Sequence, residues 1–179
     1  MDKTSNTEFY RLFLLEALPE PLTRSSAHIQ LFDNYVTGTR IRMRSVRSPE
    51  TREWVHILQQ RFPADDTPGV WKIAEMYLNE AEYEQFKVFE GNEIRKNRYF
   101  HEFDGRMVAF DVYLGELWGL NTARVDFADR AEMENYTPPK FAAFEVTGNL
   151  FFAGDSLVYK RFEEIQAEVA KLAERAEQK

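Results

Sequence analysis

Residues 37–47 read TGTRIRMRSVR and place arginine at every second position, at Arg40, Arg42 and Arg44. Apolar Ile41 and Met43 stand between them. Side chains two residues apart on a β-strand project from the same face, about 7 Å from one another. The alternation therefore predicts a strand with three guanidinium groups on one face and apolar side chains on the other.

The arginine face is an energetic problem if it is enclosed. Two unit charges 7 Å apart repel by about 2 kcal/mol at an effective dielectric near 20, and by well under 1 kcal/mol in water. A solvated face that discourages edge pairing is one interpretation. An enclosed anion site is the other, because arginine presents planar donor forks to phosphate oxygens. Lys96 and Arg98 repeat the spacing and favour a shared basic face.

Composition limits the class of protein. The chain has 179 residues, of which 44% are hydrophobic, and a formal net charge of -7. This is enough for one domain over residues 1–179, and the acidic balance disfavours nucleic acid as a partner. The absence of cysteine excludes disulfides and thiolate chemistry. No apolar signal core or run of about 18 apolar residues is present, so we expect a cytoplasmic protein without membrane segments.

Eight short alternating segments dominate the chain and predict antiparallel strands. Two turn signals, Thr37-Gly38 and Asp104-Gly105, separate neighbouring segments and indicate hairpins. The predicted strands are residues 7–18, 27–36, 39–47, 52–62, 70–78, 93–103, 106–114 and 122–127. Eight strands in one α+β domain suggest a closed barrel or a sandwich. The polar faces of these strands are then either exposed to solvent or collected inside a polar tunnel.

Three helices are predicted. Residues 79–87 and 129–136 begin with an Asn or Asp followed three residues later by Glu, the capping-box pattern. A third helix is expected over about residues 155–177. Its apolar stripe at 4-3-4-3 spacing indicates packing on the domain or, alternatively, against a partner helix. The stripe consists of Val158, Phe162, Ile165, Val169 and Leu172.

The second half of the chain resembles a known family. Residues 93–127 read EIRKNRYFHEFDGRMVAFDVYLGELWGLNTARVDF, and residues 138–149 read PPKFAAFEVTGN. The K-x-R pair, the D-V-Y-x-G-E-L-x-G-L run, the A-x-V-D-F strand and the E-V-T-G ending resemble, in order and spacing, the CYTH family of triphosphate tunnel metalloenzymes. That family includes inorganic triphosphatases, thiamine triphosphatases and class IV adenylyl cyclases. The arginine strand falls at the family's R-x-R-x-R position.

The resemblance implies a fold and a set of site residues. The fold would be α+β, an eight-stranded antiparallel closed barrel that forms a tunnel, with flanking helices and a C-terminal helix. Basic residues would hold a small phosphorylated anion, carboxylates would serve catalysis and hold Mg²⁺ or Mn²⁺, and the resemblance also allows a homodimer. The implied phosphate-binding residues are Arg40, Arg42, Arg44, Lys96 and Arg98, and we add Arg124 as a sixth candidate because of its charge; the catalytic carboxylates are Glu8, Glu75, Asp111 and Asp126, with Glu8, Asp111 and Asp126 as metal ligands.

The chain departs from the family pattern in one direction. Tyr10, Tyr77, Ala109 and Arg124 replace carboxylates, and Leu12 replaces a lysine. A cation such as Arg124 at a metal-ligand position repels a metal and could grip phosphate directly. We therefore interpret the chain as a degenerate CYTH-like protein that binds triphosphate or another phosphorylated anion. The alternative is a Mg²⁺- or Mn²⁺-dependent triphosphatase that uses its remaining carboxylates.

Overall fold

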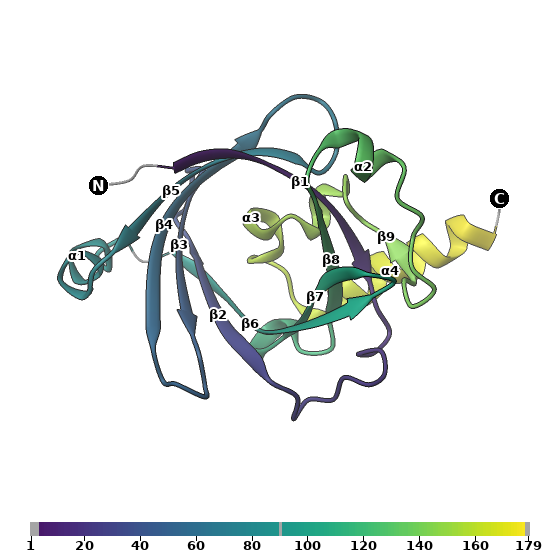
Figure 1. Ribbon diagram of the computed structural model, residues 1–179, viewed down its shortest axis with the longest axis horizontal. Coiled ribbons are helices and arrows are strands. Elements are labelled where there is room, and N and C mark those ends of the chain that lie inside the picture. Colours follow the sequence, from purple (N-terminus) through teal and green to yellow (C-terminus); the bar gives the residue numbers. More distant parts are fainter. Residues whose placement is uncertain (1–3, 90, 178–179) are drawn as a thin grey trace.

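The computed structural model describes residues 4–89 and 91–177 and has an antiparallel barrel at its centre (Figure 1). The eight barrel strands follow one another in the order β5-β4-β3-β2-β6-β7-β8-β1, and pairing of β1 with β5 closes the ring. This confirms the predicted fold class. The strands are β1 (Thr4–Leu14), β2 (His28–Tyr35), β3 (Ile41–Arg47), β4 (Trp54–Pro63), β5 (Val70–Leu78), β6 (Asn92–Phe103), β7 (Arg106–Tyr113), β8 (Asn121–Phe127) and a short ninth strand, β9 (Phe144–Glu145).

Strand β1 closes the barrel by pairing with two partners in turn. Its first half, from Thr4 to Phe9, pairs with β5, and its second half, from Phe9 to Leu14, pairs with β8. Where β1 leaves β5, the Gly69 carbonyl accepts a hydrogen bond from the Tyr10 N–H at 2.9 Å. Gly69 has φ +82°, and a Cβ there would lie 2.1 Å from the Tyr10 carbonyl oxygen, so this junction requires glycine.

Both predicted hairpin turns are present. Asp104 and Gly105 have φ of 51° and 74° between β6 and β7, the two positive values that a tight hairpin needs. Gly38, with φ 72°, lies in the turn between β2 and β3. Strand β1 ends at Leu14, four residues before the end of the predicted segment 7–18.

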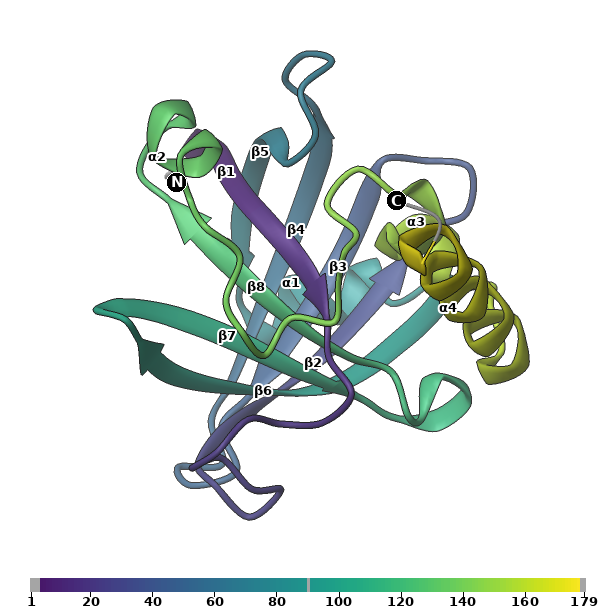
Figure 2. The same cartoon turned by 90° about the vertical axis from the view of Figure 1, so that its right-hand side faces the viewer.

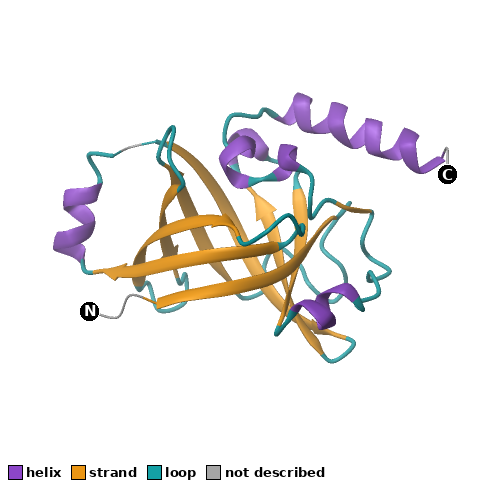
Figure 3. Ribbon diagram, turned by 90° about the horizontal axis from the view of Figure 1, so that it is seen from above, coloured by secondary structure: helices purple, strands orange, loops and turns teal. Residues whose placement is uncertain are grey.

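The helices lie outside the barrel wall or across its end. The described helices are α1 (Glu80–Phe86), α2 (Arg130–Glu134), α3 (Gly154–Leu157) and α4 (Phe162–Glu177), with 3-10 turns η1 (Gly115–Leu117) and η2 (Leu150–Phe152). Figures 1 and 3 show α1 and α4 on opposite sides of the molecule. None of these described helices has both the length and the apolar character needed to span a membrane.

The helix caps follow the sequence in part. At α1 the capping box is complete, since Asn79 accepts from the Glu82 N–H at 2.9 Å and Glu82 accepts from the Asn79 N–H at 2.8 Å. At α2 the Asp129 carboxylate accepts from the Glu132 N–H, but the Glu132 carboxylate accepts from the Ala128 N–H, one residue too early for the box. The second predicted box is therefore only half formed.

The C-terminal segment corrects the prediction of one helix over residues 155–177. Helix α3 ends at Leu157, a turn follows, and α4 begins at Phe162. Leu157 is fully buried, whereas α4 buries only Ile165. One straight helix could not bury Leu157 against the barrel and then run along the outside, so the chain turns between the two (Figure 2).

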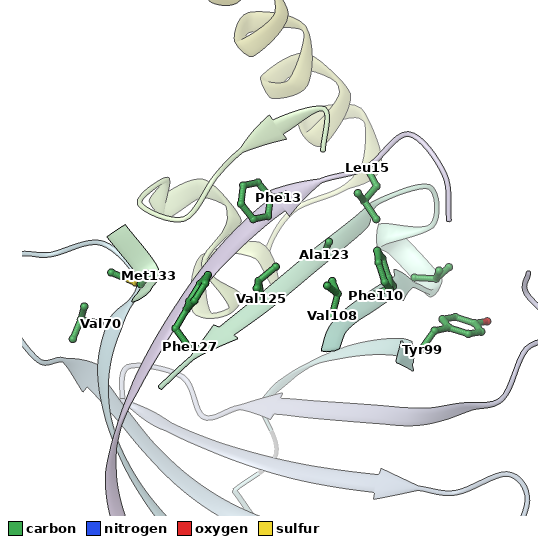
Figure 4. Close-up of a cluster of buried hydrophobic side chains, with 11 residues drawn as sticks. Phe13, Leu15, Val70, Tyr99, Val108, Phe110, Ala123, Val125, Phe127 and Met133 are labelled. Atoms are coloured by element: carbon green, nitrogen blue, oxygen red, sulfur yellow. The ribbon is translucent and has the colours of Figure 1, made fainter. Parts of the chain in front are cut away.

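A first apolar core covers the outer face of the barrel wall. Outward residues of β1, β7 and β8, including Phe13, Phe110 and Val125, are inaccessible to solvent (Figure 4). Met133 of α2 and partly buried Phe141 pack against them. The opposite side chains of these strands face the barrel interior, because neighbouring residues alternate between the two faces.

A second apolar core closes one end of the barrel. Leu14, Ile94 and Tyr113 from the strands pack with Phe152 of η2 and Leu157 of α3. In the same end, α3 approaches so closely that a Cβ on Gly154 would lie 1.8 Å from the Tyr35 hydroxyl oxygen. The η2–α3 segment therefore acts as a plug for this end of the tunnel.

The plug generates a stability prediction. We expect Leu157→Ala to lower the free energy of unfolding by about 2–4 kcal/mol, since it leaves a cavity in the end core. Leu150→Ala, at an exposed position of η2 in the same plug, is the matched control and should change the free energy of unfolding by less than about 0.5 kcal/mol. Urea unfolding followed by circular dichroism measures both, and equal effects would contradict the plug.

Candidate functional site

The barrel interior carries a polar layer at mid-height. Register places Tyr35, Arg42, Gln59 and Glu75 side by side across β2, β3, β4 and β5. On the other side of the ring, Lys96 and Arg98 of β6, Asp111 of β7 and Arg124 of β8 face inward from the same strand surfaces. The layer thus collects cations and carboxylates from strands that are far apart in sequence.

Asp33 is the centre of one charged unit. It is 1% exposed and accepts a two-point contact from Arg44, with Nε–Oδ1 at 2.6 Å and Nη2–Oδ2 at 2.7 Å. Arg42 is also buried and reaches Asp33 only loosely, with Nη1–Oδ2 at 3.5 Å. The geometry of Arg44 is the planar fork-to-carboxylate pair that fixes both side chains.

Asp111 is the centre of a second unit built in the same way. It is 2% exposed and accepts from Arg98, with Nε–Oδ1 at 2.6 Å and Nη2–Oδ2 at 2.7 Å. Lys96 Nζ lies 2.6 Å from Asp111 Oδ2. Because β2 and β6 are neighbours, with Leu31 opposite Lys96, the two units lie side by side in the tunnel wall.

The two units keep their charges. Burial raises the pKa of Asp33, but Arg42 and Arg44 outweigh it and hold that pKa well below its usual value. Burial and the Arg98 and Lys96 cations have the same opposing effects on Asp111, whose pKa is also held low. Four cations, with Lys96 protonated, therefore surround two ionised carboxylates, and the pair of units keeps a net positive charge even when Lys96 is neutral.

Arg42 has the weakest counter-charge of the four cations. Its pKa is lowered by burial and by the neighbouring Arg44. Its Nε donates to the Gln59 side-chain oxygen at 2.8 Å, and the Gln59 amide in turn donates to Glu75. Its Nη1 lies 3.3 Å from the Tyr35 hydroxyl. A neutral amide thus holds Arg42 in place where a second carboxylate would have neutralised it.

Glu8 organises a third unit beside the other two. Its Oε2 accepts from Arg124 Nη2 at 3.0 Å and from Arg61 Nη2 at 3.2 Å. Burial raises the pKa of Glu8, but Arg124 and Arg61 outweigh it and lower that pKa. Arg124 also donates from Nε to Asp126 at 2.9 Å. Within the described part of the chain, the buried Arg61 Nε has no hydrogen-bond partner, so a donor remains free in the tunnel.

The carboxylates do not form a ligand set for a divalent metal. Arg124 Nη2 lies between Glu8 and Asp126, 3.0 Å and 2.6 Å from their oxygens, and supplies the positive charge that a metal would bring. Asp111 is already occupied by Arg98 and Lys96. Over residues 4–89 and 91–177, no group of three or more His, Asp or Glu side chains is arranged to hold a metal ion. These residues therefore do not fit Mg²⁺ or Mn²⁺.

The structure brings most of the predicted site residues to the tunnel. Arg40 does not join them, since it is exposed in the turn before β3 and stacks over Phe62, with 5.2 Å from its guanidinium carbon to the ring centroid. Asp126 is largely exposed although it contacts Arg124. Those that line the polar layer are Glu8, Arg42, Arg44, Glu75, Lys96, Arg98, Asp111 and Arg124.

Sequence reasoning missed two charged residues of the layer. Asp33 follows Leu31 at strand spacing and is the only carboxylate among the inward positions of β2. Arg61 follows Gln59 by two residues on β4, and this strand spacing is the signal that could have placed both on the same inward face. Glu145 of the E-V-T-G ending lies outside the tunnel, where it accepts from Arg11 Nε at 2.8 Å.

Comparisons with known proteins bear on the fold. No protein-family model matches the chain, and no curated protein sequence matches it. The crystal structure of the inorganic triphosphatase NE1496 is similar, with a TM-score of 0.57 and 21% identity over 86% of this chain and 95% of that chain. A putative adenylyl cyclase from Hippeastrum with triphosphatase activity gives a TM-score of 0.45 at 11% identity, over 71% of this chain and 82% of that chain.

The NE1496 likeness and the barrel together define the class of fold. The chain has a CYTH-type tunnel fold, in which an eight-stranded antiparallel barrel encloses a charged interior.

Lys96 gives a pH prediction. Burial lowers its pKa from 10.5 to about 8, although the Asp111 carboxylate acts in the opposite direction. Between pH 8 and 9.5 the folded protein has then lost a proton that the unfolded chain still binds, so stability contributed by this group rises with pH. We expect the wild-type free energy of unfolding to rise by up to about 2 kcal/mol relative to Lys96→Met over this interval. The free energy of unfolding is measured with urea at each pH for both proteins. If it changes equally with pH in the two, the prediction is wrong.

Proposed function

We propose that this protein binds triphosphate or another phosphorylated anion inside its tunnel. One observation carries the proposal: in an enclosed layer, Arg42, Arg44, Lys96 and Arg98 form ion pairs with only two carboxylates, those of Asp33 and Asp111. Uncompensated positive charge is costly in such a place. A multiply charged anion relieves this cost and, because arginine forks match phosphate oxygens, gains directional hydrogen bonds as well.

The cations divide into holding and binding groups. Arg44 and Arg98 each donate two hydrogen bonds to an aspartate and so hold its carboxylate in position on the barrel wall. Arg42 and Lys96 are the second cation of each unit, and Arg42 is only loosely held by its carboxylate. We expect phosphate oxygens to bind chiefly to these two side chains and to the free Arg61 Nε.

Binding without a divalent metal is part of the proposal. Arg124 already holds the position between Glu8 and Asp126, and arginine stays protonated throughout the physiological range. The proposal therefore describes a binding protein in which Arg124 contributes charge that a metal supplies in triphosphatases. We also propose a small phosphorylated anion as its partner and a cytoplasmic location.

The second candidate is a Mg²⁺- or Mn²⁺-dependent triphosphatase. The likeness to NE1496, itself named an inorganic triphosphatase, and the presence of Glu8, Glu75, Asp111 and Asp126 favour it. It requires Arg124 to leave the space between Glu8 and Asp126.

The arginine pair Arg42 and Arg40 provides a matched test. We expect Arg42→Ala to weaken inorganic triphosphate binding by about 10- to 100-fold, because it removes a buried charged donor. Arg40→Ala should change the affinity less than about twofold, since Arg40 is exposed two residues earlier on the same segment. Isothermal titration calorimetry measures both, and equal losses would argue against an enclosed site.

Chelation separates the two candidate functions. Triphosphate affinity and phosphate release are measured with excess chelator and then with Mg²⁺ or Mn²⁺. Affinity unchanged by the chelator, with no release, is the expected result for the binding protein. Metal-dependent release of phosphate would contradict the binding protein and support the triphosphatase.

A further inference from the structure

An apolar rim lines the tunnel end opposite the plug. It consists of one inward residue from each of six consecutive strands in sheet order: Tyr77 (β5), Val55 (β4), Val46 (β3), Ile29 (β2), Phe100 (β6) and Met107 (β7). Four of them, Tyr77, Val55, Phe100 and Met107, are between 43% and 63% exposed. Large apolar side chains gathered in this way indicate a surface that binds something apolar.

Register establishes that the rim faces inward. Val55 pairs with Val46, two residues beyond Arg44. Phe100 pairs with Ala109, which pairs in turn with inward Arg124. On β6 the inward positions thus read Lys96, Arg98, Phe100, two cations followed by an exposed aromatic ring about 7 Å further along the strand.

The apolar residues at the two ends of the tunnel differ in their exposure to solvent. At the plugged end, Phe152 and Leu157 bury Leu14 and Ile94. At the rim, four apolar side chains remain exposed in the part of the chain that the structure describes. The polar layer therefore lies between an apolar layer that the chain covers itself and one that offers its surface to a ligand.

Two cavities meet at Phe100. One, of about 560 Å³, lies between Phe100, Ile29 and the β3–β4 loop at Pro49. The other, of about 450 Å³, contains Phe100, Met107 and Ala109. Both fall in the size range of small-molecule sites. Both are open clefts that also carry polar groups, among them Glu50 in the first and Glu132 in the second, so an apolar group there would pack on the Phe100 ring itself, next to the cations of β6.

We propose that the ligand is an amphiphilic phosphate, with its phosphate in the cationic layer and an aliphatic chain along the rim. This rests on the proposed anion-binding function and adds the chemistry of the rest of the molecule. An inorganic anion would leave the rim exposed, whereas an aliphatic ester removes the rim and its own chain from water together. The net charge of -7 disfavours an anionic membrane surface as the source, so the ligand is a single dispersed amphiphile.

The test is a chain-length series. Ethyl, hexyl and decyl phosphate are titrated calorimetrically below their micelle concentrations, with inorganic triphosphate in parallel. We expect the dissociation constant to fall about threefold to fourfold for each methylene that packs on the rim. Because the apolar area of the rim is finite, the gain should level off with longer chains.

Rim variants localise the effect. Phe100→Ser and Met107→Ser should remove most of the chain-length dependence, and their folding is checked by thermal unfolding. Val88→Ser, an exposed aliphatic residue between α1 and β6, is the matched control and should keep the full dependence. Loss of the dependence in the Val88 variant would overturn the assignment to the rim.

The outcomes separate the two proposals. If triphosphate binds and the alkyl series shows no dependence on chain length, the amphiphile is overturned and the anion site stands. If no phosphate compound binds at all, the proposed function itself fails. Binding to neutral vesicles without binding to dispersed alkyl phosphate, or self-association that the Phe100 and Met107 variants abolish, would assign the rim to a membrane or a second copy and overturn the inference.

Discussion

The barrel depends on one electrostatic constraint, the ionisation of Asp33 and Asp111 deep inside it. Each carboxylate is almost inaccessible to water, and each stays charged because an arginine grips both of its oxygens. Without them, Arg44 and Arg98 would be buried cations without partners, which is among the most costly arrangements in a protein interior. The wall strands can turn their polar faces inward only because these pairs form.

Because the centre of the barrel is charged, most of the large apolar side chains pack on its outer wall or at one end. The barrel has a charged layer at its centre, and its largest buried rings lie on the outer wall, where Phe13, Tyr99 and Phe110 are fully enclosed. The plug adds a smaller core at one end. This division explains why strands that alternate polar and apolar residues bury both faces, one in the core and one in the tunnel.

Much of this was accessible from sequence because strand periodicity carries it. Alternation located eight strands and placed Arg42, Lys96 and Arg98 on the polar faces of theirs, and the turn residues fixed two hairpins. It did not decide whether those polar faces point into the barrel or into solvent. Asp33 was missed because a lone carboxylate has no pattern of its own until its arginine partners are placed opposite it. The break between α3 and α4 arises because α3 packs into the end of the barrel. The helical spacing of apolar residues continues across the break, so the sequence pattern around Val158 did not predict it.

The double pairing of β1 has a consequence for biosynthesis. Strand β1 has its partners in β5 and β8, and both are synthesised after it. Contacts so distant in sequence close slowly. The barrel can therefore close only after Phe127 has been synthesised. Until then the apolar outer side of β1, with Phe9 and Phe13, has no strand β8 to pack beside. A chain in which β8 has not yet been made therefore exposes apolar surface, the condition under which aggregation competes with folding.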